Sequence, residues 1–227
     1  MTETTWVFAA GMRRSASTLQ YLLAKELVEL AGGHAAGWVI HQKFDETYQA
    51  LDGEYPFVIL KTHAFTPQFS VTADILFERQ RAVALTIFRD PRDVAASLLK
   101  INRTPQPWED VMVNMPVVLQ EFLLWSSVYA ESALIQTYET SPIHLLKEMA
   151  AFLGIATTLD WQNDCAERHS LEAHKELIDN FDGKYDRVNL LWYNHIDKGE
   201  IGRYKEELAP EQLVQIEAFY EEWKAKR

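Results

Sequence analysis

The sequence predicts an α/β protein with three layers, in which a central parallel sheet is flanked by helices. Apolar runs that do not alternate with polar residues are typical of strands buried on both faces, and four occur, at residues 6–10, 57–60, 83–88 and 134–138. Strands that alternate with helices predict a parallel sheet covered on both faces. The chain has 227 residues and no repeat or linker-like tract, so we expect one domain over residues 1–227.

The helices are predicted from leucine spacing and from residues typical of helix ends. Pro91 suits the first turn of a helix, and Asp93 places a favourable carboxylate near its positive N-terminal end. Pro116 is expected to interrupt or kink a long helical region, and Gly154 is expected to end another. The expected helices cover residues 19–30, 91–101, about 108–132, 142–153, and 210 onward.

The composition indicates an ordinary globular protein with an acidic surface. Hydrophobic residues make up 48% and charged residues 24%, and the formal net charge is −11. Such a surface repels nucleic acid and anionic membranes, so neither is an expected partner. The single cysteine, Cys165, excludes an internal disulfide framework. We find no signal peptide and no apolar run long enough to cross a bilayer, so we expect a soluble, cytoplasmic protein.

Basic and hydroxyl side chains follow three of the predicted strands. In parallel sheets, ligands bind beyond the carboxyl ends of the strands, so these residues are expected to share one site. An anionic ligand is the natural partner for such a local basic site in an acidic protein. The residues are Arg13, Arg14, Ser15, Ser17 and Thr18 after the first strand, Lys61 and His63 after the second, and Arg89 after the third.

The segment 11–18 joins a strand to a helix through small and basic residues. Free backbone N–H groups at a helix start attract an oxyanion, and an arginine and two hydroxyls add charge-assisted hydrogen bonds. The Gly-Lys-Ser/Thr sequence of a nucleoside-triphosphate loop is missing. A capped helix with two exposed arginines is the structural alternative.

Three further segments carry candidate site residues. His63 can titrate near neutrality and take a proton from a hydroxyl, and Lys61 points to the same side of the chain. Arg89 could bind a second phosphate together with Ser97, although an Arg–Asp surface pair is an equal alternative. The segment 197–205 is a basic loop with glycines that permit close backbone approach to a ligand, or a plain connector.

Taken in order, these four segments resemble the sulfotransferases that use 3′-phosphoadenosine 5′-phosphosulfate (PAPS). The segment 14–19 resembles the family's 5′-phosphosulfate loop, and Lys61-Thr62-His63 resembles its Lys-Thr-His segment. Arg89 and Ser97 match the pair that grips the 3′-phosphate, and the segment 198–202 matches the Lys-Gly-x-x-Gly loop. Ser170 and Leu171 stand where the family often has Ser-Phe near the adenine.

The resemblance implies a P-loop-like sulfotransferase fold and an enzyme that moves a sulfuryl group from PAPS to a hydroxyl of a small acceptor, leaving adenosine 3′,5′-bisphosphate (PAP). It implies that His63 is the general base, that Arg14 stabilises the leaving phosphate, and that Lys61 assists near the sulfuryl group. No metal is expected, because arginine and lysine supply the positive charge and no ligand cluster is evident. The implied nucleotide-binding residues are Arg13, Arg14, Ser15, Ala16, Ser17, Thr18, Leu19, Arg89, Ser97, Ser170, Leu171, Lys198 and Gly199.

The sequence also departs from the family pattern. Ala16 replaces the usual glycine, and Leu19 replaces a tryptophan that stacks on adenine in many members. Asp197 replaces an arginine, and Arg203 replaces a common aspartate. The family's usual dimer segment is not recognisable, which leaves the oligomeric state open.

Two other functions remain as alternatives: a nucleotide or small-molecule kinase of related architecture, and a nucleotide-binding module without catalysis. The acceptor is expected to contact residues of the irregular segments 38–55, 102–108 and 190–195, and a small, partly apolar alcohol or phenol is favoured. Their aromatic candidates, each of which could equally be ordinary packing, are Phe44, Tyr48, Trp108, Trp192 and Tyr193.

Overall fold

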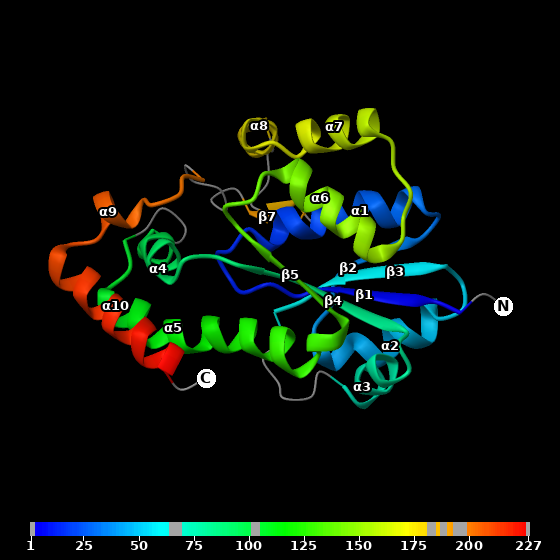
Figure 1. Ribbon diagram of the computed structural model, residues 1–227, viewed down its shortest axis with the longest axis horizontal. Helices are drawn as coiled ribbons and strands as arrows, with labels where there is room; N and C mark the ends of the chain where they lie inside the picture. The colour runs from blue at the N-terminus through cyan, green and yellow to red at the C-terminus, as the bar shows by residue number, and fades with distance from the viewer. Residues whose placement is uncertain are drawn as a thin grey trace.

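The computed structural model describes residues 3–63, 70–100, 105–180, 185–186, 190–192 and 199–225 (Figure 1). Its centre is a five-stranded sheet in the order β2-β3-β1-β4-β5, and every pair of neighbours is parallel. The predicted three-layer α/β fold is confirmed. The strands are β1 (Thr5–Ala9), β2 (His34–Trp38), β3 (Phe57–Lys61), β4 (Ala82–Phe88) and β5 (Ala133–Thr137), and β6 (Tyr185–Asp186) and β7 (Leu191–Trp192) form a separate antiparallel pair.

Helices cover both faces of the sheet and its carboxyl edge (Figure 1). One face carries α1 (Ser17–Leu30), α6 (Pro142–Leu153), α7 (Leu159–Arg168) and α8 (Leu171–Asn180). The other face carries α2 (His41–Leu51), α3 (Val71–Glu78) and α5 (Trp108–Leu123). Beyond the carboxyl edge lie α4 (Pro91–Leu99), α9 (Tyr204–Glu207) and α10 (Pro210–Ala225).

The burial of both sheet faces explains why the strands are apolar without alternation. Along β1, Val7 and Ala9 pack into the core beneath α1 and α6, whereas Trp6 and Phe8 pack into the opposite core. All four side chains are fully buried. Burying one large apolar side chain contributes about 1.5–3 kcal/mol, so each strand face is a substantial source of stability.

Several elements were not predicted. The segment 38–55, which was expected to be irregular, contains the end of β2 and all of α2. The helices α3, α7 and α8 were also not predicted. The sequence of β2 is mostly small residues, and Gly37 adopts a φ of 75° where the register with β3 shifts. Such a strand lacks the apolar run on which the prediction depended.

The helix α5 differs from expectation because it runs through Pro116 without interruption. A π-helical turn, Leu124–Val128, follows it, and together they form a 21-residue helix whose mean hydropathy of 1.4 is high enough to cross a membrane. The expectation that no segment reaches that length is therefore wrong. One face of α5 nevertheless packs into the interior, where Met115 and Leu119 are fully buried against α4 and α10, whereas Val113 is exposed.

Gly33 is a point of close approach between the end of α1 and β3. A Cβ at this position would lie 2.6 Å from the Phe57 carbonyl oxygen and 2.6 Å from Val28 Cγ1. We expect Gly33→Ala to lower the free energy of unfolding by about 1–3 kcal/mol, because one of these elements must move. Chemical denaturation measures this change, and a variant as stable as the parent protein would contradict the close approach.

Candidate active site at the carboxyl edge of the sheet

The loop from β1 to α1 forms a tight turn with an unusual backbone. Arg14 and Ala16 have φ values of 63° and 64°, in the left-handed region, although neither is glycine. Each such residue costs about 1–2 kcal/mol, and backbone strain of this kind is concentrated at functional sites. Ser15 donates a hydrogen bond of 2.6 Å to the Met12 carbonyl, which closes the turn. Ala16, the residue before α1, has no side-chain oxygen to cap the helix, so the positive end of α1 is suited to an anion.

Two arginines from different strand ends meet beside this loop. Arg14 Nε donates to Ser97 Oγ at 2.9 Å, and Arg89 Nη1 donates to the Arg14 carbonyl at 3.0 Å. Arg89 Nη2 donates to the Glu200 carbonyl at 3.2 Å, and its guanidinium lies 4.1 Å from the centre of the Tyr138 ring. The side chain is buried, yet its Nε has no hydrogen-bond partner within the described residues. Two distant segments thus place cationic groups at one point, next to the Glu200 carbonyl of a third.

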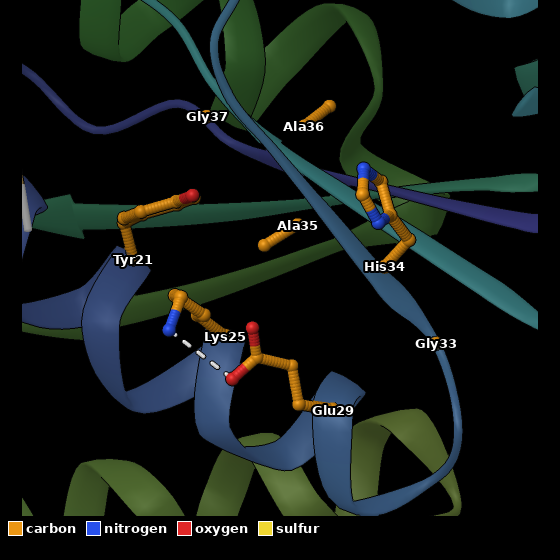
Figure 2. A pocket seen from close by; sticks show the side chains of 8 residues that line it. All are labelled: Tyr21, Lys25, Glu29, Gly33, His34, Ala35, Ala36 and Gly37. Carbon is orange, nitrogen blue, oxygen red and sulfur yellow. Dashed lines mark hydrogen bonds and ion pairs between the residues drawn. The ribbon is translucent and has the colours of Figure 1, made fainter. Parts of the chain in front are cut away.

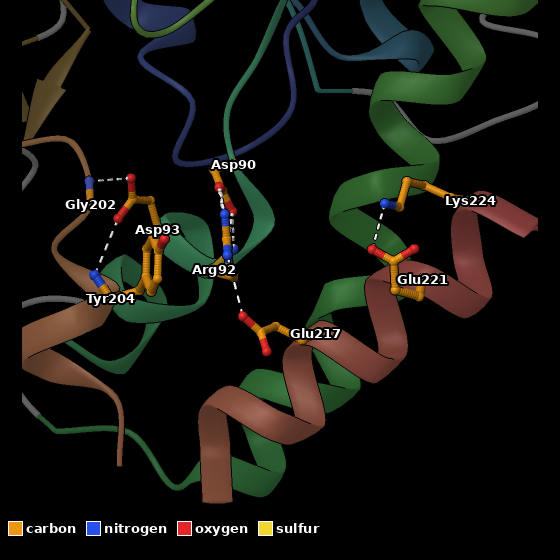
Figure 3. A network of polar contacts seen from close by, with 8 residues as sticks. All are labelled: Asp90, Arg92, Asp93, Gly202, Tyr204, Glu217, Glu221 and Lys224. Atoms are coloured by element: carbon orange, nitrogen blue, oxygen red, sulfur yellow. Dashed lines mark hydrogen bonds and ion pairs between the residues drawn. The ribbon is translucent and has the colours of Figure 1, made fainter. Parts of the chain in front are cut away.

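The loop that precedes α9 is held in place by Asp93. Its buried carboxylate accepts hydrogen bonds from Gly202 N at 2.8 Å and from Tyr204 N at 3.2 Å (Figure 3). Tyr138 adds a third tie, because its hydroxyl donates to the Gly199 carbonyl at 2.7 Å. The loop therefore has a defined place beside Arg89. Asp197 and Lys198, which were expected in this loop, lie outside the described residues.

The remaining expected nucleotide contacts occupy different positions. Leu171 lies against Gly199, where an added Cβ would come within 2.9 Å of Leu171 Cδ2. Ser170 Oγ accepts a hydrogen bond from Ala173 N at 3.2 Å and so caps the start of α8. Thr18 is buried at the start of α1, and Leu19 packs against the core beneath α1. The structure thus places Leu171 beside the loop before α9, whereas Leu19 contributes to the core.

His63, Ser17 and Lys61 form a hydrogen-bonded group next to the loop. His63 Nδ1 lies 2.7 Å from the Gly11 carbonyl oxygen, which only accepts hydrogen bonds, so we assign the proton of the neutral ring to Nδ1. His63 Nε2 is then an acceptor, and it lies 3.5 Å from Ser17 Oγ. Lys61 Nζ donates to the same hydroxyl at 2.9 Å. A basic ring nitrogen and an amine are therefore oriented toward the start of α1.

Lys61 carries an amine that is shielded from solvent. Burial lowers the pKa of Lys61 to about 7, and the nearby Glu121 carboxylate partly opposes this shift. Conversely, burial raises the pKa of Glu121 to about 7, while Arg13 and Lys61 oppose that shift. Glu121 forms an ion pair with Arg13, with 2.7 Å between Oε1 and Nη2.

Sequence analysis missed Glu121. It lies on the side of α5 that also buries Val118 and Phe122, so a carboxylate within an apolar helix face was the available signal.

A cavity of about 260 Å³ opens beside His63. It is lined by Arg13, Trp38, Ile40, His41, Gln42, Thr62 and His63. The rings of Trp38 and His63 are 5.2 Å apart, edge to face. Among the aromatic residues expected near an acceptor, Phe44 and Tyr48 instead pack on Trp6, and Trp108 Nε1 donates to Gln215. The side chain of Trp192, and all of Tyr193, lie outside the described part of the chain.

A second cavity, of about 340 Å³, lies between α1 and the edge strand β2 (Figure 2). The Lys25–Glu29 ion pair, 3.1 Å long, lies along one wall, and none of the lining residues belongs to the basic group at the strand ends. We therefore assign no role in the active site to this cavity.

One group of described side chains could hold a metal ion, although none was expected from the sequence. The ligand atoms of Glu26, Cys165 and His169 lie within 4.8 Å of one another. His169 Nε2 is 3.1 Å from Glu26 Oε1, and its Nδ1 is 3.1 Å from His174 Nε2. Arg168 pairs with the other oxygen of Glu26 at 2.9 Å. These hydrogen bonds and the ion pair already satisfy the ring nitrogens and the carboxylate.

The fold is that of an α/β protein with basic side chains gathered at the carboxyl edge of its sheet, and comparison with known proteins gives its family. The model of the sulfotransferase domain family matches residues 11–226, so this chain belongs to that family. No curated protein sequence matches the chain.

Two solved structures with a similar fold are each bound to PAP. The mouse sulfotransferase SULT7A1, solved in complex with PAP, has a TM-score of 0.66 and 19% identity, over 97% of this chain and 84% of its own. Retinol dehydratase, solved in complex with androsterone and the inactive cofactor PAP, has a TM-score of 0.63 and 15% identity, over 96% and 80%. The predicted sulfotransferase fold is confirmed.

The buried amine of Lys61 should reduce stability in the absence of ligand. We expect Lys61→Met to raise the free energy of unfolding at pH 7 by about 1 kcal/mol, because it removes a buried amine that is protonated in the unfolded chain. The pKa of Lys61 falls from 10.5 to about 7 on folding, so the unfolded chain binds more protons between these values. The free energy of unfolding of the parent protein therefore increases as the pH rises from about 7 to 10.5. The difference in stability between the parent protein and the more stable variant should shrink over the same range.

Denaturation of the parent protein and the variant at several pH values measures this difference. A variant that is less stable than the parent across the whole pH range would show that the contacts of Lys61 outweigh its burial.

Proposed function

We propose that this protein transfers the sulfuryl group of PAPS to a hydroxyl of a small acceptor and releases PAP. The observation that carries the proposal is the meeting of Arg14, Arg89 and the start of α1 at the carboxyl edge of the sheet. The protein is a member of the sulfotransferase family, and the two similar structures described above contain PAP. The positive charge of these groups suits a ligand with phosphate at two positions.

In this proposal the loop before α1 binds the 5′-phosphosulfate. Backbone N–H groups of residues 15–18 at the positive end of α1 bind the phosphate oxygens, and the hydroxyls of Ser15, Ser17 and Thr18 line the turn. Arg13 and Arg14 supply charge, and Leu19 follows on the helix. The left-handed conformation of Ala16 supplies the turn that glycine provides in the family pattern.

The 3′-phosphate binds Arg89 and Ser97, and Lys198 and Gly199 are the further contacts that we propose for the nucleotide. The Arg89 Nε group without a described partner is a donor available to such a phosphate. Because Leu171 packs against Gly199, we place the adenine near Ser170 and Leu171.

The chemistry follows from the tautomer of His63. The acceptor hydroxyl gives its proton to His63 Nε2 as its oxygen forms a bond to sulfur, and the bond from sulfur to the 5′-phosphate oxygen breaks. Lys61 and Arg14 stabilise the negative charge that develops on the sulfuryl and phosphate oxygens. Side chains thus supply the electrostatic stabilisation, and the proposed step requires no metal.

The cavity beside His63 is the proposed acceptor site. Its volume of about 260 Å³ and the side chains of Trp38 and Ile40 suit a small alcohol or phenol with an apolar body. We further propose that the chain acts as one domain in the cytoplasm, on small molecules rather than on nucleic acid or membranes, in keeping with its net charge of −11.

We expect His63→Ala to lower turnover by about 10²–10⁴-fold, the usual contribution of a general base, while PAP affinity stays close to that of the parent protein. Rates with PAPS and a panel of phenols and primary alcohols, together with PAP titration, measure both effects. His144→Ala is the matched control, because this histidine is exposed on α6 and contacts Glu148. Near-normal turnover in the His63 variant would remove it as the base.

We expect PAP to stabilise the parent protein by about 2.7 kcal/mol at 100-fold excess over its dissociation constant, without magnesium, and AMP to give little stabilisation at the same concentration. Arg89→Ala should remove most of this preference, because its guanidinium binds the phosphate that AMP lacks. Thermal unfolding with each nucleotide provides the measurement, and Arg79→Ala is the control, because Arg79 is exposed at the end of α3, next to the start of β4 rather than its carboxyl end.

Equal stabilisation of the parent protein by PAP and AMP would contradict the roles of Arg89 and Ser97. Binding of PAP without sulfated product from any acceptor would instead indicate a binding module.

A further inference from the structure

Glu121 is a buried carboxylate that joins the last turn of α5 to the loop between β1 and α1. Its side chain is fully buried, yet it contacts Arg13 twice. Oε1 lies 2.7 Å from the Arg13 guanidinium, and Oε2 accepts a longer hydrogen bond of 3.4 Å from the Arg13 backbone N–H. These contacts link two segments that are 108 residues apart in the sequence.

Burying a carboxylate at this position lowers the stability of the fold. The neighbouring positions on the same side of α5 carry Val118 and Phe122, and an apolar side chain would fill the space without a desolvation penalty. The charge is therefore best explained by the cations beside it. These are Arg13, which lines the cavity at His63, and Lys61, which donates to Ser17.

We infer that Glu121 is a positioning residue for the proposed sulfuryl transfer. It anchors Arg13 of the loop between β1 and α1, and it keeps Lys61 in its ammonium form before PAPS binds. This inference rests on the proposed function.

The anchoring part follows from geometry. Arg13 immediately precedes Arg14, whose left-handed backbone conformation must be imposed by its surroundings. By accepting a hydrogen bond from the backbone of Arg13 and forming an ion pair with its guanidinium, Glu121 fixes the chain direction on entry to this turn.

The electrostatic part follows from the groups around Lys61. Ser17 of α1 accepts its hydrogen bond, and the same hydroxyl lies 3.5 Å from His63 Nε2. Glu121 of α5 supplies the negative charge that favours the ammonium form, and Glu121 in turn pairs with Arg13. Once PAPS is bound, its own anionic oxygens favour the ammonium form as well. Glu121 should therefore matter most in the free enzyme.

This reasoning predicts a specific change in pH dependence. The ammonium form of Lys61 is lost as the pH rises through its pKa, so activity has an alkaline limit. Glu121→Gln removes the negative charge and keeps a similar shape, so this limit in kcat/KM should move to lower pH by about one unit. The limit in kcat should move less, because kcat reports the enzyme with substrate bound.

The test measures kcat and kcat/KM from pH 5.5 to 9 with PAPS and the best phenol or alcohol found for the parent protein. Glu121→Asp keeps the charge on a shorter side chain, so it should retain the parent pH limit even if its overall rate falls. Glu29→Gln is the matched control: Glu29 pairs with Lys25 beside the second cavity, to which no site residue belongs, and its replacement should leave the pH profile unchanged.

The outcomes separate the two levels of the proposal. A parent protein that forms no sulfated product overturns the proposed function and this inference with it. An active parent, with a Glu121→Gln variant whose rate falls equally at every pH, overturns the inference alone, because that result describes a purely structural residue. If Glu121→Gln fails to fold, a shifted alkaline limit in Glu121→Asp contradicts the inference, and an unchanged limit in that folded variant supports it.

Discussion

The site depends on the hydrogen bonds that the buried guanidinium of Arg89 donates to backbone carbonyls. It starts at the end of β4 and donates to carbonyl oxygens of the β1–α1 loop and of the loop before α9. Backbone carbonyls hold a cation in place without neutralising its charge, whereas a carboxylate would neutralise it. The same bonds that join three segments therefore leave net positive charge at the carboxyl edge, in a protein whose overall charge is −11.

The acidic residues near the site fall into two groups: those that hold the backbone in place and one that acts on the cations of the site. Among the described residues, the hydrogen bonds that Asp93 accepts come only from backbone N–H groups of the loop before α9, while Arg92 pairs with Asp90 and Glu217 at the surface (Figure 3). Glu121 is different, because it forms an ion pair with Arg13 and its charge also acts on the buried Lys61. The acidic residues near the site thus hold its frame and tune its cations, without forming direct ion pairs with Arg89 among the described residues.

The sequence was informative wherever local pattern and tertiary structure agree. Unalternating apolar strands predicted β1, β3, β4 and β5, and basic residues after three of them predicted the position of the site. Strand β2 was missed because its mostly small residues form no apolar run, and the interruption expected at Pro116 is absent because α5 continues through it. Glu121 and the Glu26–Cys165–His169 group required knowledge of which helices pack together, which no local spacing contains. The roles of the individual site residues remain predictions.

The left-handed conformations of Arg14 and Ala16 have a consequence for how a nucleotide would associate. A turn already bent into its final shape needs little reorganisation on encounter, so little conformational entropy is lost when an anion arrives. Association should then be limited by diffusion and charge rather than by a slow rearrangement of the turn, and affinity should be governed mainly by how quickly the ligand leaves.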